Sequence, residues 1–166
     1  MFDLKPLHPD SIAAALEKAM RYRLLNEPGE AESICLDVLV VEPDNQKALV
    51  LLLLAMTDRF GRGYAVSAER MQEVLGRLRD DYERCYYTGI VRERNGKSQL
   101  HGSAPGSGFA AYELLREAMG FYEQAEKIRP PGNDDARLRW NACARLIMGN
   151  HLTARPVEPY EPVLGE

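Results

Sequence analysis

The chain has 166 residues, 45% hydrophobic and 28% charged, which is ordinary for one folded domain with a substantial core. Its net charge of −4 argues against a general nucleic-acid binder, which would carry a basic excess. The first residues lack the apolar core of a signal peptide, and Lys47 and Asp58 bracket the most apolar stretch, 49–55, too tightly for a membrane span. We expect a buried helix there and no membrane partner.

Helical periodicity dominates the first half of the chain, and no segment shows the two-residue alternation of a β-strand. We expect helices over about residues 12–26, 29–41, 46–57 and 64–79. Turn-forming residues separate them, including Pro28-Gly29, Pro43-Asp44-Asn45 and the glycine-rich stretch 58–63.

The second half continues with expected helices over about residues 80–94, 109–129 and 135–148. Between the first two lies 95–108, rich in Gly, Ser and Pro, which we interpret as a long loop. The residues after 150 alternate proline with acidic and apolar residues, which predicts an extended tail over 151–166. Residues 1–150 are expected to form a single helical domain.

Two stretches share one spacing of small and large residues. The intervals of four, three and five residues put the first three positions on one helical face, and a proline then ends the helix. The two sets are Ala31, Cys35, Val38, Pro43 and Ala118, Tyr122, Ala125, Pro130. Small residues at these positions allow a neighbouring helix to approach closely.

These residues resemble the tetratricopeptide repeat (TPR), a helix-turn-helix unit of about 34 residues that stacks into a solenoid. Preceding helices also carry parts of the pattern, in Ala19 and Tyr22 and more loosely in Tyr86 and Gly89. Cys35 and Val38 depart from the usual aromatic and alanine. With Ala68 as the middle equivalent, the excess length of the repeats falls in the expected turns and the 95–108 loop.

The resemblance implies an all-α, right-handed TPR-like α-solenoid of about three helix-turn-helix units plus a C-terminal capping helix, about seven helices in all. A non-repeat helical bundle is the alternative, because a four-position pattern also occurs in ordinary bundles.

Catalytic readings of the sequence are weak. Gly96-Lys97-Ser98 resembles the end of a phosphate-binding loop, but the glycine required five residues earlier is Val91. The three histidines are far apart and lack partners at metal-ligand spacing on a shared helix. Cysteines 35, 85 and 143 are odd in number and set in helical patterns, which indicates packed, reduced thiols in a cytoplasmic protein. We therefore expect no enzyme activity, no cofactor and no metal.

Binding of another protein or peptide is what the resemblance implies, since the first helices of TPR units line a concave groove. The candidate contact residues, including two from the basic 95–108 loop, are Met20, Arg23, Tyr86, Ile90, Arg94, Lys97, His101, Arg137, Trp140 and Asn141. Trp140 could equally be a core or end-cap aromatic. The Lys, Asn and Arg set with which some members clamp a carboxylate is not found.

An acidic protein segment is the expected ligand type of the 95–108 loop, because Arg92, Arg94, Lys97 and His101 make this part of an acidic protein basic. A mobile insertion without a role is the alternative. For the whole chain, the alternative to an adaptor is a structural protein that self-assembles, for example as a homodimer, through uncovered solenoid ends.

Overall fold

The computed structural model describes residues 2–63 and 66–156. Over these ranges the chain forms seven α-helices and no β-strand, which confirms the predicted all-α class. The helices are α1 (Ile12–Leu24), α2 (Pro28–Val41), α3 (Gln46–Thr57), α4 (Ala68–Gly76), α5 (Asp81–Leu100), α6 (Ser107–Lys127) and α7 (Asp135–Gly149), and a single 3₁₀ turn (Pro9–Ser11) precedes α1.

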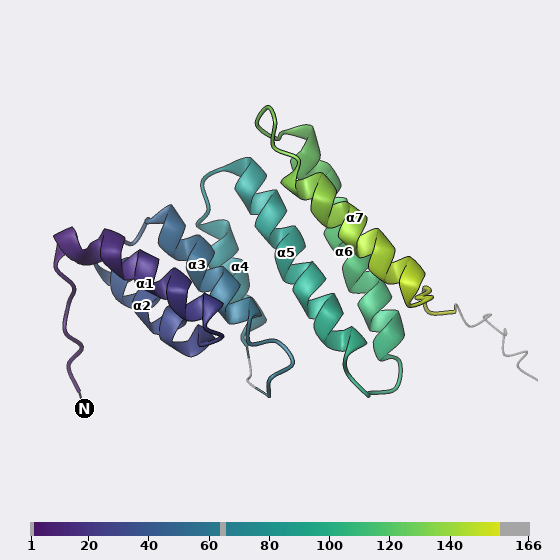
Figure 1. The fold of residues 1–166 in the computed structure, drawn as a ribbon, viewed down its shortest axis with the longest axis horizontal. Coiled ribbons are helices and arrows are strands. Elements are labelled where there is room, and N and C mark those ends of the chain that lie inside the picture. The colour runs from purple at the N-terminus through teal and green to yellow at the C-terminus, as the bar shows by residue number, and fades with distance from the viewer. Residues whose placement is uncertain (1, 64–65, 157–166) are drawn as a thin grey trace, which may run out of the picture.

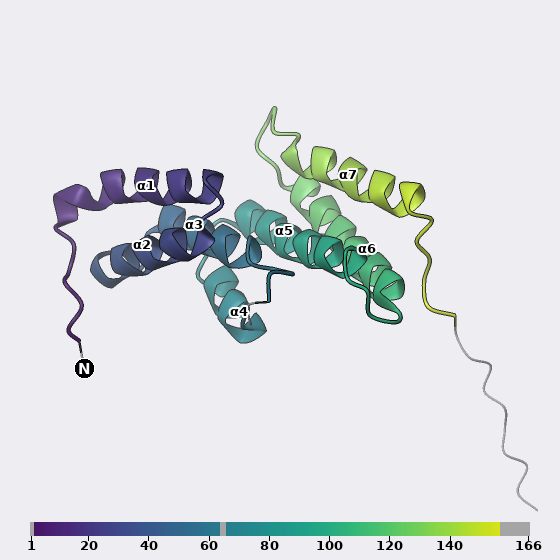
Figure 2. The same ribbon diagram turned by 60° about the horizontal axis from the view of Figure 1, so that its bottom comes forward.

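The helices form an elongated, bent array in which chain neighbours pack side by side (Figure 1). Each helix contacts the next one in the chain, and α3 also contacts α1 and α5. Figure 2 shows α1 and α7 raised at the two ends of one side of the array, with α3 and α5 between them, while α4 and α6 lie toward the other side. We call the side formed by α1, α3, α5 and α7 the inner face.

Short polar side chains begin three of the helices. The side chain of Asn45 accepts a hydrogen bond from the Ala48 amide at the start of α3, at 2.9 Å. Ser67 does the same for α4, and Asp80 accepts from the Glu83 amide of α5 at 2.8 Å. These bonds satisfy amides that have no partner inside a first helical turn. The helix starts are therefore set locally, before packing fixes their orientation.

Two separate hydrophobic clusters form the core. The first is built by α1 to α4, and the second by α5, α6 and α7. Helix α5 belongs to both, because Val91 packs in the first cluster and its neighbour Ile90 in the second. The apolar run 49–55 lies in α3 at the centre of the first cluster, with five of its seven residues buried, as the sequence predicts.

The helical positions of both repeated patterns are buried in the core. Cys35 and Tyr122 are fully buried, as are the small residues around each of them: Ala31, Val38, Ala118 and Ala125. Gly89 of α5 lies against the Tyr122 ring, so closely that a Cβ at this position would sit 2.5 Å from Cε1 of the tyrosine. The small residue of one helix thus makes room for the aromatic side chain of the next.

Ala68 is not equivalent to Ala31 and Ala118, so the predicted middle register is wrong. Ser67 caps α4, which makes Ala68 the exposed first residue of a helix of only nine residues. The buried face of α4 is carried by Met71, Val74 and Leu75 instead. The predicted helix over 64–79 is correspondingly shorter at both ends, and residues 64 and 65 lie outside the described ranges.

The predicted loop over 95–108 is also wrong for most of its length. Helix α5 continues to Leu100 and α6 begins at Ser107, so the connection is 101–106. Gly96 remains helical because α6 passes close by, and a Cβ there would lie 3.1 Å from Leu115 Cγ and 3.3 Å from the Ala111 carbonyl oxygen. A glycine that suggests a turn in the sequence is here a site of close helix packing.

The predicted tail is described only at its start. Residues 152–156 lie in no helix, and 157–166 fall outside the described ranges.

We expect Gly89→Ala to destabilise the fold by about 1–3 kcal/mol, because the added methyl must displace the buried Tyr122 ring. Urea or guanidinium denaturation followed by circular dichroism measures the change in unfolding free energy.

Gly120→Ala in α6 is the matched control, since a Cβ at Gly120 meets nothing within 4 Å. Alanine is favoured over glycine inside a helix, so this variant should be more stable than the native chain by up to about 1 kcal/mol. Equal effects of the two substitutions would contradict the close approach of Gly89 to Tyr122.

Candidate functional site

A charged cluster on the inner face joins α1, α3 and α5 around Asp58, the residue that ends α3. Arg23 of α1 donates to its carboxylate through Nε at 2.7 Å and Nη2 at 3.2 Å. Arg94 of α5 donates through Nη1 at 2.6 Å to Oδ1, the oxygen that also accepts from Arg23 Nη2. The same Nη1 lies 2.7 Å from Thr57 Oγ1 and 3.2 Å from the Leu54 carbonyl oxygen. One carboxylate thus holds guanidinium groups from α1 and α5, two helices that each contact α3.

A second charged cluster joins α5, α6 and α7 around Glu93, whose side chain is fully buried. The Tyr122 hydroxyl donates to Glu93 Oε2 at 2.6 Å, and Arg139 Nη1 of α7 donates to Oε1 at 3.2 Å. Lys97, one turn further along α5, also donates to Oε1. These three donors give a buried carboxylate the partners it requires.

The pKa of Glu93 reports the balance of these contacts. Burial acts to raise the pKa of this carboxyl, but hydrogen bonds from Lys97 and Tyr122, with the charges of Lys97 and Arg139, bring it below its ordinary value. Burial, together with the adjacent Glu93 charge, raises the pKa of the Tyr122 phenol. At neutral pH, Glu93 is therefore ionised and Tyr122 is its neutral donor.

The two charged clusters influence each other electrostatically, and together they carry more positive than negative charge. Burial lowers the pKa of Arg94, Asp58 opposes this effect, and the positive charges of Arg23 and Arg139 lower the pKa further. Arginine remains protonated despite such a shift. We call the group formed by Arg23, Arg94, Lys97 and Arg139 around Asp58 and Glu93 the cationic centre. Its four cations exceed its two carboxylates by two charges, in a chain with a net charge of −4.

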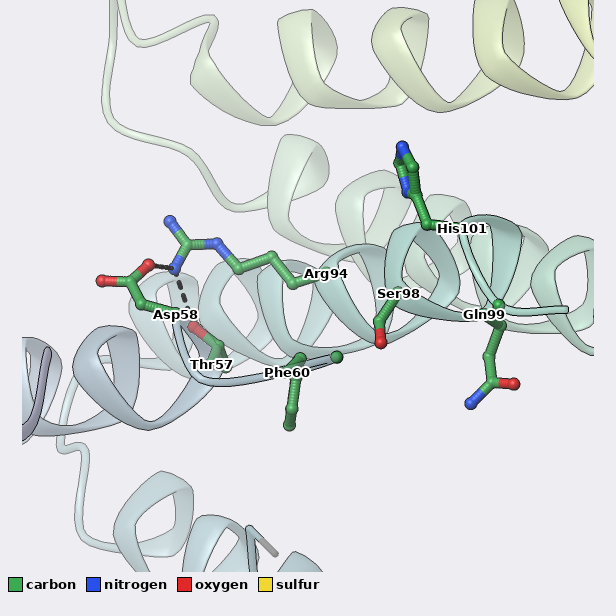
Figure 3. A pocket seen from close by; sticks show the side chains of 9 residues that line it. Thr57, Asp58, Phe60, Arg94, Ser98, Gln99 and His101 are labelled. Atoms are coloured by element: carbon green, nitrogen blue, oxygen red, sulfur yellow. Dashed lines mark hydrogen bonds and ion pairs between the residues drawn. The ribbon is translucent and has the colours of Figure 1, made fainter. Parts of the chain in front are cut away.

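A pocket of about 600 Å³ opens beside the Asp58 cluster, between the end of α3 and the C-terminal part of α5 (Figure 3). Nη2 of Arg94 points away from Asp58 and Thr57, and His101 extends from the end of α5. The side chains of Phe60, Ser98 and Gln99 also line the pocket. The pocket therefore offers hydroxyl, amide, imidazole and guanidinium groups beside one aromatic ring.

A tyrosine cluster lies along the N-terminal part of α5. The Tyr82 and Tyr86 rings stack with centroids 5.7 Å apart, and Tyr86 also meets Tyr87 edge-on at 5.2 Å. The centroid of the Tyr86 ring lies 5.9 Å from that of Tyr122, whose hydroxyl donates to Glu93. All three α5 tyrosines are only partly buried, so an aromatic surface adjoins the cationic centre.

The structure brings four of the predicted contact residues to this region. Arg23, Arg94 and Lys97 belong to the cationic centre, and His101 lines the pocket while its Nδ1 lies 2.7 Å from the Lys97 carbonyl oxygen. Tyr86 stands in the adjoining tyrosine cluster.

Other predicted contact residues lie elsewhere. Ile90 is 2% exposed and packs in the second core cluster, so its prediction as a contact residue is wrong. Trp140 donates through Nε1 to Glu123 of α6 at 2.9 Å, and Arg137 pairs with Glu126 of the same helix. These two residues tie α7 to α6. Met20 of α1 is 43% exposed, and Asn141 is partly buried in α7.

Sequence reasoning missed the acidic residues on which the site depends. Asp58 follows Leu54 by four residues, and Glu93 follows Gly89 by four, so each carboxylate continues a packed helical face. An acid in that register indicates a buried charge with partners. Arg139 was missed because its partner lies 46 residues away in the chain.

Comparison with protein-family models, curated proteins and solved structures found no match to this chain. Among the described residues, no helix is both long and apolar enough to cross a membrane. Nor do those residues contain a group of three or more His, Cys, Asp or Glu side chains placed to hold a metal ion.

We expect Glu93→Gln to destabilise the fold by about 3 kcal/mol at neutral pH, because it removes the negative charge that balances Lys97 and Arg139 in a buried site. The pH dependence has a definite sign. Since the folded-state pKa of Glu93 is lowered, its contribution is present above the unfolded pKa and is lost as pH falls through the lower folded value. The variant should therefore lose less stability on acidification below about pH 4.5.

Glu113→Gln provides the matched control, as it makes the same charge change at an exposed position of α6. Its effect should stay within about 0.5 kcal/mol. Denaturation curves collected from pH 3 to 7 compare the three proteins, and parallel curves for native and Glu93→Gln chains would argue against the buried carboxylate.

Proposed function

We propose that this chain is a non-catalytic protein-interaction module that binds an acidic segment of another protein on its inner face. The cationic centre carries the proposal, because it places two uncompensated positive charges beside exposed tyrosine surface in an otherwise acidic protein. Complementary charge favours encounter with an acidic segment, and aromatic surface provides contact area for it.

The exposure of the cations fits a binding role. The side chains of Lys97 and Arg139 are 36% and 38% exposed, and that of Arg94 is 25% exposed. Each is held at one end by an internal carboxylate, so little further side-chain freedom is lost on binding. A ligand carboxylate would meet cations that are already in place.

The repeat pattern supports a TPR-like scaffold for this module. Equivalent burial of the Ala31 and Ala118 patterns, and the packing of Gly89 on Tyr122, are what stacked helix pairs require. In this proposal the helices form a right-handed TPR-like solenoid with a degenerate middle unit, and α7 covers its C-terminal end.

The thiols favour binding over catalysis. Burial raises the pKa of both Cys35 and Cys143 to about 12, so neither forms a thiolate readily at neutral pH. All three cysteines are free.

The binding proposal is tested by selecting peptides from a random display library on the immobilised chain. Selected peptides should be enriched in Asp and Glu, and calorimetry should show weaker binding as salt increases, because the interaction depends on charge. Gln99→Glu adds a negative charge in the pocket without touching either charged cluster. It should weaken binding about fivefold, the effect of an exposed charge pair worth up to about 1 kcal/mol.

Gln124→Glu is the control for this experiment, since it makes the same change at an exposed position of α6. It should leave affinity unchanged. Failure to select any binding peptide, or selection of basic ones, would reject the proposal.

Self-assembly is the second candidate, and exposed apolar side chains on the first helix pair favour it. Leu24, Leu25 and Val40 are 83%, 61% and 70% exposed. Exposed apolar side chains at both ends of one helix pair favour burial against another copy of the chain.

Size-exclusion chromatography with light scattering decides between the two candidates. If self-assembly is the main role, the native chain should be a dimer and Leu24→Ser/Val40→Ser should convert it to a monomer with unchanged helicity. A native monomer at all concentrations would leave only the interaction module.

A further inference from the structure

The chain itself contains a segment with the composition that the cationic centre requires. Residues 157–166 read Val-Glu-Pro-Tyr-Glu-Pro-Val-Leu-Gly-Glu, with three glutamates and no Lys or Arg. Each of the first two glutamates precedes a proline, at 159 and 162, and a proline restricts the backbone freedom of the residue before it. A segment restricted in this way loses less conformational entropy when it binds.

The described part of the chain leads toward the site. After α7, the side chain of Leu152 lies near Gly108, 3.9 Å from the position of a Cβ there. The guanidinium carbon of Arg155 stands 5.9 Å from the centroid of the Phe109 ring, and its Nη2 lies 3.6 Å from the Cβ position of Gly106. Residues 152–155 therefore run beside the connection between α5 and α6, whose first residues, His101 and Gly102, line the pocket.

The remaining distance is within reach of ten residues. Gly106 is five residues beyond His101, so even a fully extended connection separates them by at most about 18 Å. The segment 157–166 can span about 33 Å when extended. Counted from Pro156, Glu161 can extend about 17 Å and Glu166 about 33 Å, so these two glutamates can reach the pocket, which Arg94 of the cationic centre also lines, without any movement of the helices.

The charges of residues 157–166 and of the cationic centre are complementary. Asp58 and Glu93 are each already bonded to two cationic side chains, so they do not present free negative charge to an incoming glutamate. The excess of two positive charges remains for an added acidic segment, and the Phe60 ring in the pocket offers a contact for Tyr160, Val163 or Leu164.

We propose that residues 157–166 bind the cationic centre and the adjoining pocket of their own chain, and so compete with an acidic segment of a partner. The inference rests on the proposed function, since both ligands use the same surface. It makes the tail a built-in competitor that a partner must displace.

The probe is a fluorescein-labelled synthetic peptide of residues 156–166, titrated with the full-length chain and followed by anisotropy. Glu158→Gln/Glu161→Gln/Glu166→Gln in the full-length chain removes the competing charges, and this variant should bind the peptide at least fivefold more tightly than the native chain. The control Asp3→Asn/Glu17→Gln/Glu113→Gln makes an equal charge change at exposed positions outside the cationic centre and should bind as the native chain does. Equal affinity of all three proteins would overturn the inference.

A carbodiimide, which couples a carboxylate to an amine in direct contact, gives a second measurement. In the monomeric chain it should join Glu161 or Glu166 to Lys97 in preference to Lys5, Lys18, Lys47 or Lys127, as identified by mass spectrometry. Coupling spread evenly over the lysines, or found only in cross-linked dimers, would contradict binding within one chain.

The outcomes separate this inference from the proposed function. If library-selected acidic peptides bind and the 156–166 peptide does not bind even to the tail variant, the inference fails and the interaction module stands. If no acidic peptide binds any of the proteins, the proposed function fails and the inference falls with it.

Discussion

The bonds that α5 makes in opposite directions hold the array together. Arg94 reaches Asp58 at the end of α3, and the adjacent Glu93 receives Tyr122 of α6 and Arg139 of α7. Consecutive helical residues point about 100° apart, so one short stretch of α5 serves both halves of the molecule. Charged groups make these connections where apolar packing is divided, because the two hydrophobic clusters are separate and meet at α5, where Tyr87 packs against both.

The two charged clusters, around Asp58 and Glu93, also explain how an acidic protein acquires a basic surface. Burying Glu93 requires several donors, and cations from α5 and α7 are among them. Asp58 similarly holds arginines from α1 and α5. Each carboxylate therefore has more positive than negative charge around it. The excess positive charge thus comes from the residues that connect the helices. The same residues form the proposed binding surface.

Much of the fold could be predicted from local sequence. The buried faces of α2 and α6, the turns at Pro28 and Pro43, and the buried α3 follow from spacing and from proline placement. The errors occur where a glycine or an alanine is compatible with two different structural roles. Gly96 permits close packing against Leu115 and does not form a turn, while Ala68 is the first residue of α4 and lies outside the core. The packing of the neighbouring helix determines which role such a residue takes.

The candidate site could be predicted only in part. Arg23 and Arg94 stand out as cations on the first helices of the predicted units, and Lys97 as a cation of the predicted loop, but Asp58 lies 35 and 36 residues away from the two arginines. Ile90 illustrates the opposite error, because it shares a helical face with Tyr86 and Arg94 and is nevertheless covered by α6 and α7 side chains. Spacing identifies a face, and tertiary packing determines whether solvent reaches it.

The sharing of α5 between two clusters has a consequence for how the molecule unfolds. Unfolding of α1 to α4 exposes Val91 of this helix to water, while Ile90 stays packed against α6 and α7. The molecule is therefore expected to open one half at a time, with α5 as the helix that both halves share.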